Sequence, residues 1–252
     1  MKQYSNQQTI SQTTSQATTL VLLPGFDGTG KLFTRLIDSL NEQNKQKTLD
    51  IRVASYTNEI ELDDYVQTVR NLIGDEKVTL LAESFSGPIA IQLLSQYPET
   101  VERCIFSTSF AETPYLSLCN KAMQLPNIMF TSQTMRQMAM KQFCYGRHFT
   151  ASLGKETLKT VQKLPVSVIK QRLSLLSKQS SQALISTIDT PCLYLKASDD
   201  KIVTSDLSEK FHSLLPNVRV HEIEGPHLLL QAKPADCAAA ILTFCNESAN
   251  ET

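Results

Sequence analysis

The sequence predicts an α/β fold in which a mostly parallel sheet is wrapped by helices on both faces and interrupted by one helical insertion. Short β-rich runs alternate with helical patterns from Thr18 onward, which is typical of a parallel sheet built with crossover helices. The alternation stops between residues 112 and 188, where the chain is rich in Met, Gln and Lys and has a helical pattern throughout. A length of 252 residues suits one core with such an insertion.

The order of these patterns divides the chain into three parts. We expect a disordered polar tail over 1–17, a core over 18–111 and 189–248, and a helical cap over 112–188. Six strands are predicted in the core, over residues 19–23, 51–55, 78–82, 104–108, 192–196 and 219–223. Five core helices are predicted, several from apolar residues at three- and four-residue spacing, over residues 31–42, 62–73, 87–96, 207–214 and 235–245.

The composition is that of an ordinary globular protein. Apolar residues make up 41%, charged residues 19% and the net charge is −1, so nothing favours nucleic acid as a partner. The six cysteines include no C-x-x-C pair and are expected to be reduced thiols rather than disulfides or zinc ligands. The first nineteen residues lack the features of a signal or transit peptide, and no apolar run is long enough for a transmembrane segment. We therefore expect a cytoplasmic protein.

One apolar run leads through a serine directly into a helical pattern. The run 78–82 is followed by Ser84, and small residues, Ala82 and Ser86, stand two positions before and after it. Small residues are needed at both places where a strand turns sharply into a helix, because the two backbones nearly touch there. Ser84 is therefore a candidate nucleophile, and Ser86 is its rival. The alternative without a catalytic role is a serine that only caps the following helix.

Two later strands are each followed by a titratable side chain. The run 192–196 precedes Asp199 and Asp200, and the run 219–223 precedes His227 by a short loop that contains Gly225 and Pro226. A pair of aspartates after a strand usually only forms part of a turn. Glu112 is a weaker candidate for the acid that orients the histidine. The other three histidines, His148, His212 and His221, are expected to be surface or packing residues.

Together these segments resemble the serine hydrolases of the α/β-hydrolase superfamily, although Ala82 and Ser86 replace both glycines of the G-x-S-x-G motif. The resemblance implies that Ser84, Asp200 and His227 form a catalytic triad in the chain order of that superfamily. Alignment on Ala197 and Val203 selects Asp200 as the acid and leaves Asp199 as a solvated turn residue or helix cap.

The loop after the first predicted strand has two interpretations. The resemblance implies an oxyanion hole made by the backbone N–H groups of Phe26 and Phe85. Gly25-x-x-x-x-Gly30-Lys31 also has the spacing of a phosphate-binding loop. Leu32 stands where that loop needs Ser or Thr, and Asp27 would put a carboxylate in it, so we disfavour nucleotide binding. No two histidines have the spacing of a helical zinc site, and no metal or cofactor is expected.

The resemblance implies a serine carboxyl-ester hydrolase that works through an acyl-enzyme. The string Leu23–Gly30 also resembles the phytyl ester synthase and diacylglycerol acyltransferase branch, so an acyltransferase or thioesterase of the same fold stays open. No histidine has an aspartate five residues later, so the acyltransferase H-x-x-x-x-D motif is missing and hydrolysis is favoured. A non-catalytic receptor for acyl ligands is the alternative of another class.

The predicted cap is strongly basic. Residues 112–188 contain ten Lys or Arg against two acids, a charge of +8 that leaves −9 for the rest of the chain. Such segregation suggests an acidic partner, such as an acyl carrier protein, a coenzyme A conjugate or an anionic membrane, although a solvated face is the usual explanation. The carrier contacts predicted from this charge are Lys155, Lys159, Lys163 and Lys170.

A Met-rich stretch of the cap could contact an acyl chain. Met123, Met129, Phe130 and Met135 are predicted to line such a channel, because Met adapts to flexible ligands, with packing of the cap on the sheet as an equal alternative. In size, core motifs and basic cap the chain also resembles the carboxylesterases that demethylate pimeloyl-[acyl-carrier protein] methyl ester in biotin synthesis. That resemblance makes a carrier-linked acyl ester the first substrate to test.

Overall fold

The core is a six-stranded sheet in which every strand is parallel to its neighbours. A computed structural model describes residues 18–45, 49–113, 116–178 and 180–247, so the tail predicted over 1–17 lies outside the described residues. The strand order is β2-β1-β3-β4-β5-β6. All six predicted strands are present, with bounds β1 Thr18–Leu23, β2 Leu49–Val53, β3 Val78–Glu83, β4 Val101–Ser107, β5 Cys192–Ala197 and β6 Val218–Ile223.

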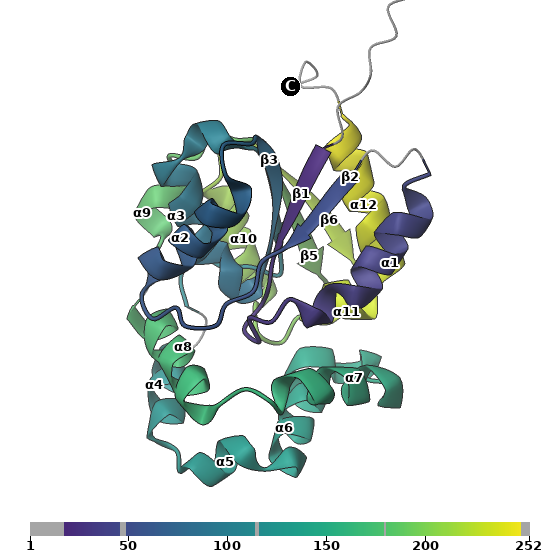
Figure 1. The fold of residues 1–252 in the computed structure, drawn as a ribbon. Coiled ribbons are helices and arrows are strands. Elements are labelled where there is room, and N and C mark those ends of the chain that lie inside the picture. The colour runs from purple at the N-terminus through teal and green to yellow at the C-terminus, as the bar shows by residue number, and fades with distance from the viewer. Residues whose placement is uncertain (1–17, 46–48, 114–115, 179, 248–252) are drawn as a thin grey trace, which may run out of the picture.

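Helices cover both faces of this sheet, as predicted (Figure 1). Alternate side chains of β1 enter different cores, since Val21 and Leu23 belong to one apolar cluster while Leu20 and Leu22 belong to the other. One face carries α2 Leu62–Ile73, α3 Gly87–Gln96, α9 Gln182–Ile185 and α10 Ser205–Ser213. The other carries α1 Thr34–Gln43, α11 Leu229–Ala232 and α12 Pro234–Asn246.

Local chemistry fixes where the core helices begin and end. Helix α2 starts with a capping box in which the Glu61 and Asp64 side chains each accept a backbone N–H, and it ends at Gly74, whose φ is 66°. Proline occupies the first turn of α3 and of α12, where the missing N–H costs nothing. Short 3-10 turns, Lys31–Phe33, Ser84–Ser86 and Pro98–Thr100, precede α1, α3 and β4.

The insertion between β4 and β5 is helical and lies as a separate layer at the carboxyl ends of the strands (Figure 1). Its two ends meet, because Glu112 and Ser180 form an antiparallel bridge and the Ser181 N–H donates to the Ala111 carbonyl at 2.9 Å. Its helices are α4 Leu116–Gln124, α5 Asn127–Thr131, α6 Gln133–Ala139, a π-helical stretch Met140–Tyr145, a 3-10 turn Gly146–His148, α7 Ala151–Val161 and α8 Val166–Lys178.

The end of the insertion differs from the predicted boundary at residue 188. Helix α9 packs on α3, and Ile185 and Ile188 are buried in the core cluster on that face of the sheet. The separate layer therefore ends near Ser180, and residues 182–188 belong to the core. Within the described ranges, no helix is both long and apolar enough to cross a membrane.

Candidate active site

A sharp turn joins β3 to α3 and carries Ser84. The backbone of Ser84 is left-handed, with φ at 45°, which is unusual for a residue with a side chain. The turn is crowded, since a Cβ on Gly87 would lie 2.8 Å from the Ser109 Oγ. Ser109 in turn donates to the carbonyls of Ala82 and Ser84 at 3.2 Å each. A side chain at Gly87 would thus collide with Ser109 in this turn.

Ser84, His227 and Asp200 form one hydrogen-bonded chain. The Ser84 Oγ lies 2.9 Å from His227 Nε2, and His227 Nδ1 lies 2.8 Å from Asp200 Oδ2. The other Asp200 oxygen accepts the backbone N–H groups of Ile202 and Val203 at 2.7 and 2.8 Å. All three side chains are buried, so the loops after β3, β5 and β6 bring a serine hydroxyl, an imidazole and a fixed carboxylate together out of water.

The rival residues make other contacts. Ser86 Oγ donates to the Pro24 carbonyl at 2.5 Å and lies 3.0 Å from the Tyr56 hydroxyl, in the buried base of the turn. Glu112 forms an ion pair with Lys210 at 2.6 Å. Among the described residues, neither of them hydrogen-bonds to His227, whose side-chain partners are Ser84 and Asp200.

Asp199 has a role that the sequence did not predict. Instead of a solvated turn residue or a helix cap, it is the anchor of an ion-pair cluster with two residues of the insertion, Arg147 at 2.8 Å and His148 at 2.6 Å. The hydrogen bond from His148, and then those from Arg147, lower the pKa of Asp199. Arg147 also pairs with Glu224 at 2.9 Å. His148 is therefore neither a surface nor a packing residue, because it ties the insertion to the loop that carries Asp200.

That cluster is also the one group of possible metal ligands among the described residues. His148, Asp199 and Glu224 have ligand atoms within 4.8 Å of one another. The Arg147 guanidinium already hydrogen-bonds both carboxylates, so a cation would have to displace it. These residues fit an ion-pair network better than a metal centre.

The loop after β1 places Phe26 beside the turn that carries Ser84. The Phe26 and Phe85 rings meet edge to face with centroids 5.9 Å apart. The peptide group between Gly25 and Phe26 is fixed through its neighbours: the Gly25 N–H donates to Glu83 Oε2 at 3.2 Å, and the Gly25 carbonyl accepts the Gly28 N–H at 3.0 Å. In the described structure no hydrogen bond is recorded for the Phe26 N–H, which leaves it available as a donor.

Arg172 reaches this loop from helix α8 of the insertion. Its Nη1 donates to the Phe26 carbonyl at 2.8 Å and its Nη2 to the Tyr56 carbonyl at 3.2 Å, while the guanidinium lies 5.8 Å from the centre of the Phe85 ring. Only 2% of Arg172 is exposed. Arg172 is thus a buried contact to the predicted oxyanion loop rather than one of the surface charges of the cap.

Glu83, the residue before Ser84, is a buried acid that sequence reasoning missed. Besides Gly25 it accepts a hydrogen bond from Gln231 at 2.9 Å, and burial raises the pKa of Glu83 to about 7. Burial also raises the pKa of Asp27, which accepts bonds from Thr29. The sequence does indicate that Glu83 is buried, because it is a charged residue at the end of an apolar strand. No local pattern indicates that Arg172 is buried.

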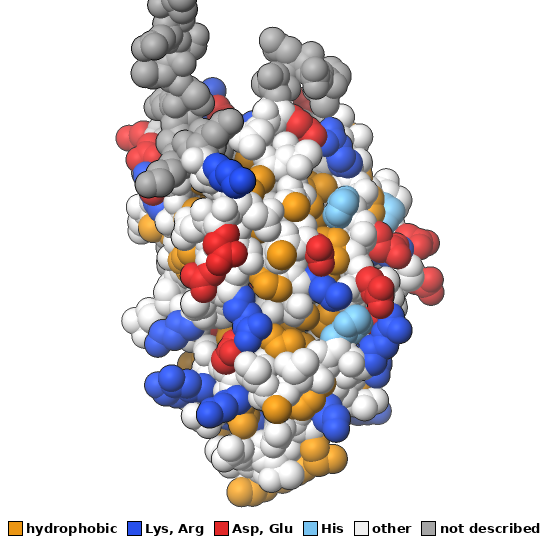
Figure 2. Space-filling view, turned by 90° about the vertical axis from the view of Figure 1, so that its right-hand side faces the viewer, with side chains coloured by type: hydrophobic (Ala, Val, Ile, Leu, Met, Phe, Trp, Pro, Cys, Tyr) orange, Lys and Arg blue, Asp and Glu red, His pale blue; other side chains and the backbone are white. Residues whose placement is uncertain are grey.

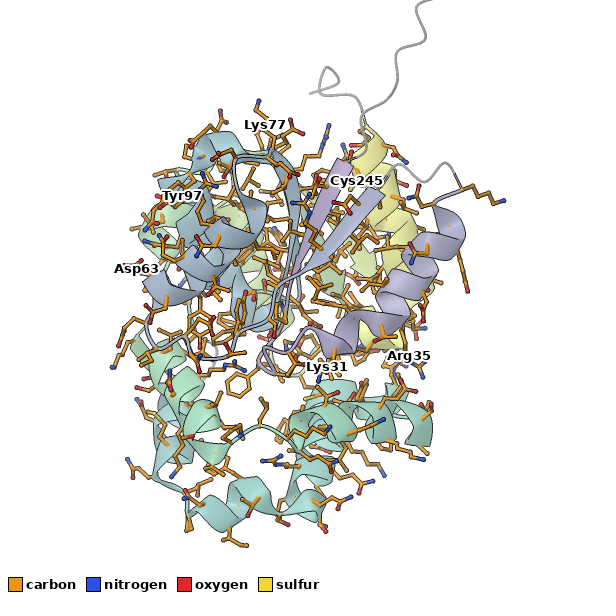
Figure 3. The ribbon with its side chains drawn as sticks, viewed as in Figure 1. Lys31, Arg35, Asp63, Lys77, Tyr97 and Cys245 are labelled. Atoms are coloured by element: carbon orange, nitrogen blue, oxygen red, sulfur yellow. The ribbon has the colours of Figure 1, made fainter. Side chains whose placement is uncertain are left out.

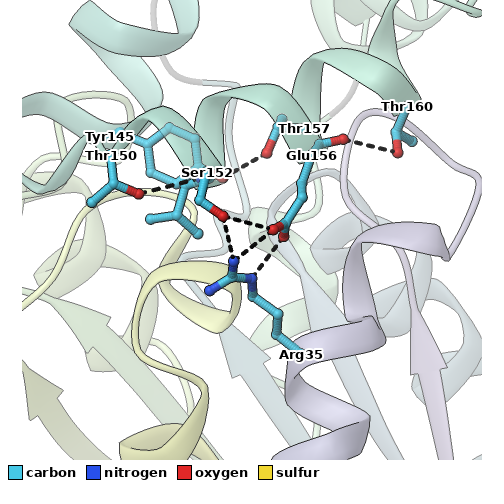
Figure 4. Close-up of polar contacts among 8 residues, drawn as sticks. Arg35, Tyr145, Thr150, Ser152, Glu156, Thr157 and Thr160 are labelled. Carbon is cyan, nitrogen blue, oxygen red and sulfur yellow. Dashed lines mark hydrogen bonds and ion pairs between the residues drawn. The ribbon is translucent and has the colours of Figure 1, made fainter.

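A cavity of about 520 Å³ lies between α7 and the core, and none of Ser84, Asp200 and His227 is among its lining residues. Its wall includes Thr29, three residues after Phe26, and Gln231, four residues after His227. Lys31 and Arg35 lie at the end of the core that faces the insertion (Figure 3). Arg35 binds Glu156 through two nitrogens at 2.7 Å and Ser152 at 3.2 Å, which ties α1 to α7 (Figure 4). The remaining lining residues are Leu32, Thr34, Tyr145, Leu153, Thr157, Lys159, Thr160 and Lys163.

The residues predicted to line an acyl channel are not in this lining. Met129 and Met135 are 36% and 39% exposed, and neither they nor Met123 and Phe130 contribute to the cavity wall. Three of these four residues lie on α5 and α6 at the outer end of the insertion (Figure 1), and an acyl channel over the four stays a prediction.

The predicted carrier contacts are only partly brought together. Lys155 and Lys159 lie one turn apart on α7, and Lys163 follows the end of that helix. Lys170 lies on α8, donates to the Leu125 carbonyl at 3.1 Å and contacts the Phe130 ring at 5.6 Å. Lys159 and Lys163 face the cavity, whereas Lys170 holds parts of the insertion together.

A buried Ser–His–Asp chain at the carboxyl edge of a parallel sheet, with the serine on a left-handed strand-to-helix turn, defines the class of α/β hydrolases. The model of the hydrolase family described as serine aminopeptidase, S33, matches residues 52–231, more than half of the chain. The chain belongs to this family.

Solved structures share the fold at low sequence identity. A hydrolase from Oleispira antarctica, olei00960, superposes with a TM-score of 0.78 at 14% identity over 92% of each chain. A bromoperoxidase from Bacillus anthracis gives 0.77 at 15% identity, over 92% of this chain and 93% of its own, and an esterase from Exiguobacterium antarcticum gives 0.75 at 13% over the same shares. No curated protein has significant sequence similarity to the chain. These likenesses establish the fold.

The raised pKa of Glu83 predicts a pH-dependent stability. The Glu83 carboxyl loses its proton near pH 4.5 in the unfolded chain but keeps it up to about pH 7 in the folded chain. The free energy of unfolding should therefore fall by about 3 kcal/mol between these two pH values. Glu83→Gln, which is neutral and nearly the same shape, should remove this decrease. Urea unfolding of both proteins at pH 5 and about pH 8 measures it, and equal pH slopes would contradict the assignment.

Proposed function

We propose that this protein is a serine carboxyl-ester hydrolase with Ser84 as nucleophile, His227 as base and Asp200 as the acid that orients the histidine. The observation that carries the proposal is the continuous hydrogen-bonded chain from Ser84 Oγ through both nitrogens of His227 to Asp200. With one Asp200 oxygen held by two backbone N–H groups, its other oxygen is left to fix the tautomer that has the proton on His227 Nδ1.

The geometry supports a two-step reaction. Ser84 Oγ attacks the ester carbonyl while its proton moves to His227 Nε2, and the N–H groups of Phe26 and Phe85 stabilise the oxyanion. The histidine then returns the proton to the leaving alcohol, which departs and leaves an acyl-enzyme on Ser84. In the second step water attacks this acyl-enzyme with the same base, the acid is released and Ser84 recovers its proton.

We place the acyl group of the substrate in the cavity between α7 and the core. The hydrogen-bonded chain does not line this cavity, but Thr29 and Gln231 join it to the loop after β1 and to α11, and its lining favours neutral or anionic acyl compounds. Lys31, Lys159 and Lys163 line it, and its one acid, Glu156, is already paired with Arg35. A peptide with a free amino terminus would bring a positive charge to this lining without an unpaired carboxylate to receive it. The lining therefore supports an ester over the aminopeptidase substrate in the family's name, and it is compatible with a carrier-linked acyl ester.

An acyltransferase or a thioesterase would use the same three side chains. A receptor would bind acyl ligands without turning these ligands over. A fluorophosphonate probe separates the receptor from the enzymes, because it reacts only with an activated serine. Turnover assays then separate the reaction types. The substrates are p-nitrophenyl esters, a methyl ester, a thioester and an aminoacyl p-nitroanilide, each with and without added alcohol. Cleavage of the anilide alone would contradict the proposed esterase.

The first prediction concerns the nucleophile. Ser84→Ala should abolish probe labelling and p-nitrophenyl butyrate hydrolysis without unfolding the protein, because only the nucleophilic oxygen is lost. Ser86→Ala is the matched control: it loses a buried hydrogen bond to Pro24 and should keep labelling. Labelling that survives in Ser84→Ala and disappears in Ser86→Ala would contradict the assignment.

The second prediction separates the two adjacent aspartates. Asp200→Asn should lower kcat by a factor on the order of 10⁴, as removal of the triad acid does when it leaves the wrong histidine tautomer. Asp199→Asn weakens only the ion pairs with Arg147 and His148 and should change kcat much less. Steady-state kinetics on one ester measures both, and equal losses would leave the acid unassigned.

The third prediction concerns Arg172 as a positioning residue. Arg172→Met removes the bond to the Phe26 carbonyl, so the oxyanion donor should lose its orientation and kcat should fall about tenfold or more, with a smaller change in KM. Arg172→Lys should recover part of kcat, and Lys178→Met, an exposed change on the same helix, should match the unaltered protein. A KM effect alone would contradict this role.

A further inference from the structure

Large apolar side chains are exposed mainly on one part of the insertion. Of the nine large hydrophobic residues that are exposed in the described chain, seven lie between residues 116 and 143, and only Ile60 and Val220 lie elsewhere. Monomeric proteins usually expose such residues singly, so their concentration marks a contact surface. The seven are Leu116, Leu125, Ile128, Met129, Met135, Met138 and Phe143.

Helices α5 and α6 present four of these side chains to solvent, and Leu125 lies just before α5. Neither helix buries a side chain, so neither is held by an apolar core. They are attached from behind by polar bonds, because Arg136 donates to the carbonyls of Phe130, Val161 and Leu164, and Lys170 donates to the Leu125 carbonyl. We call Leu125, Ile128, Met129, Met135 and Met138 the distal surface, since Figure 1 shows α5 and α6 at the end of the molecule away from the sheet.

The segment that carries the distal surface holds only positive charge. The sequence from Thr113 to Lys155 contains no Asp or Glu and five Lys or Arg. Lys121 and Lys141 are exposed, and Arg136 bonds only backbone carbonyls, so no acid is recorded beside these three cations in the described residues. Figure 2 shows the lower end of the molecule, which the insertion forms, with orange and blue side chains and with red ones only higher up.

We propose that the distal surface binds an anionic lipid bilayer. Exposed Ile, Leu and Met side chains can enter the boundary between headgroups and acyl chains, while Lys and Arg beside them attract anionic lipids. A second copy of the chain fits less well, because a symmetric contact would bring two acid-free, positive surfaces together. The inference does not depend on the proposed chemistry. It accounts for the exposed methionines of the insertion as lipid contacts.

The test is sedimentation of the full chain with vesicles, with no turnover involved. The unaltered protein should bind vesicles of phosphatidylglycerol mixed with phosphatidylcholine, bind pure phosphatidylcholine more weakly, and lose affinity as salt is raised. The double variant Ile128→Ser with Met138→Ser should bind at least about tenfold more weakly, since these side chains are 68% and 61% exposed and both would enter the bilayer. Probe labelling of Ser84 should be unchanged in it.

The matched control changes the two exposed apolar residues of the core. Ile60→Ser with Val220→Ser removes side chains that are 56% and 40% exposed, and this variant should bind vesicles like the unaltered protein. The proposal is overturned if the unaltered protein does not bind anionic vesicles at low salt, or if both double variants bind alike. It is also overturned if the distal surface binds an acidic carrier protein or a second copy of the chain and not the vesicles.

Discussion

The left-handed backbone of Ser84 is the constraint on which the site depends. It lets β3 reverse through the 3-10 turn Ser84–Ser86 into α3, and this reversal is crowded at Gly87, where a Cβ would lie 2.8 Å from the Ser109 Oγ. The reversal lifts the Ser84 hydroxyl above the carboxyl edge of the sheet. Since all six strands are parallel, the loops after β1, β5 and β6 open on the same edge, and His227 and Asp200 meet the serine there.

Two buried ionisable side chains hold the loop after β1. Glu83 comes from the sheet and binds the Gly25 N–H, and Arg172 comes from the insertion and binds the Phe26 carbonyl. Taking such groups out of water is costly unless they are hydrogen-bonded, so their burial indicates that the position of this loop is important. The insertion also holds the other two loops, through Arg147 to Asp199 and through the Cys144 carbonyl, which accepts the Leu228 N–H at 3.2 Å.

The sequence predicted what depends on local order. Strand and helix patterns, the small residues around Ser84 and the loop before His227 are all readable within a dozen residues, so all six strands, the class of fold and the three residues of the hydrogen-bonded chain could be predicted. Contacts between distant segments could not. Nothing near Arg172 distinguishes it from an exposed lysine, and its partner Phe26 is 146 residues away. The Met-rich composition around Met129 and Met135 led us to expect a channel there, but composition does not show which way α5 and α6 face.

The bridge between Glu112 and Ser180 makes the insertion a nearly closed excursion of the chain. The polypeptide leaves and re-enters the core at one place, so the core needs from these residues little more than a short connection between β4 and α9. Because the entropy of closing a loop grows only slowly with its length, helices can be lengthened, shortened or exchanged there at small cost to the sheet. Such a segment is free to diverge quickly in evolution, while the few side chains that reach back to the three loops set the limit on how far it can change.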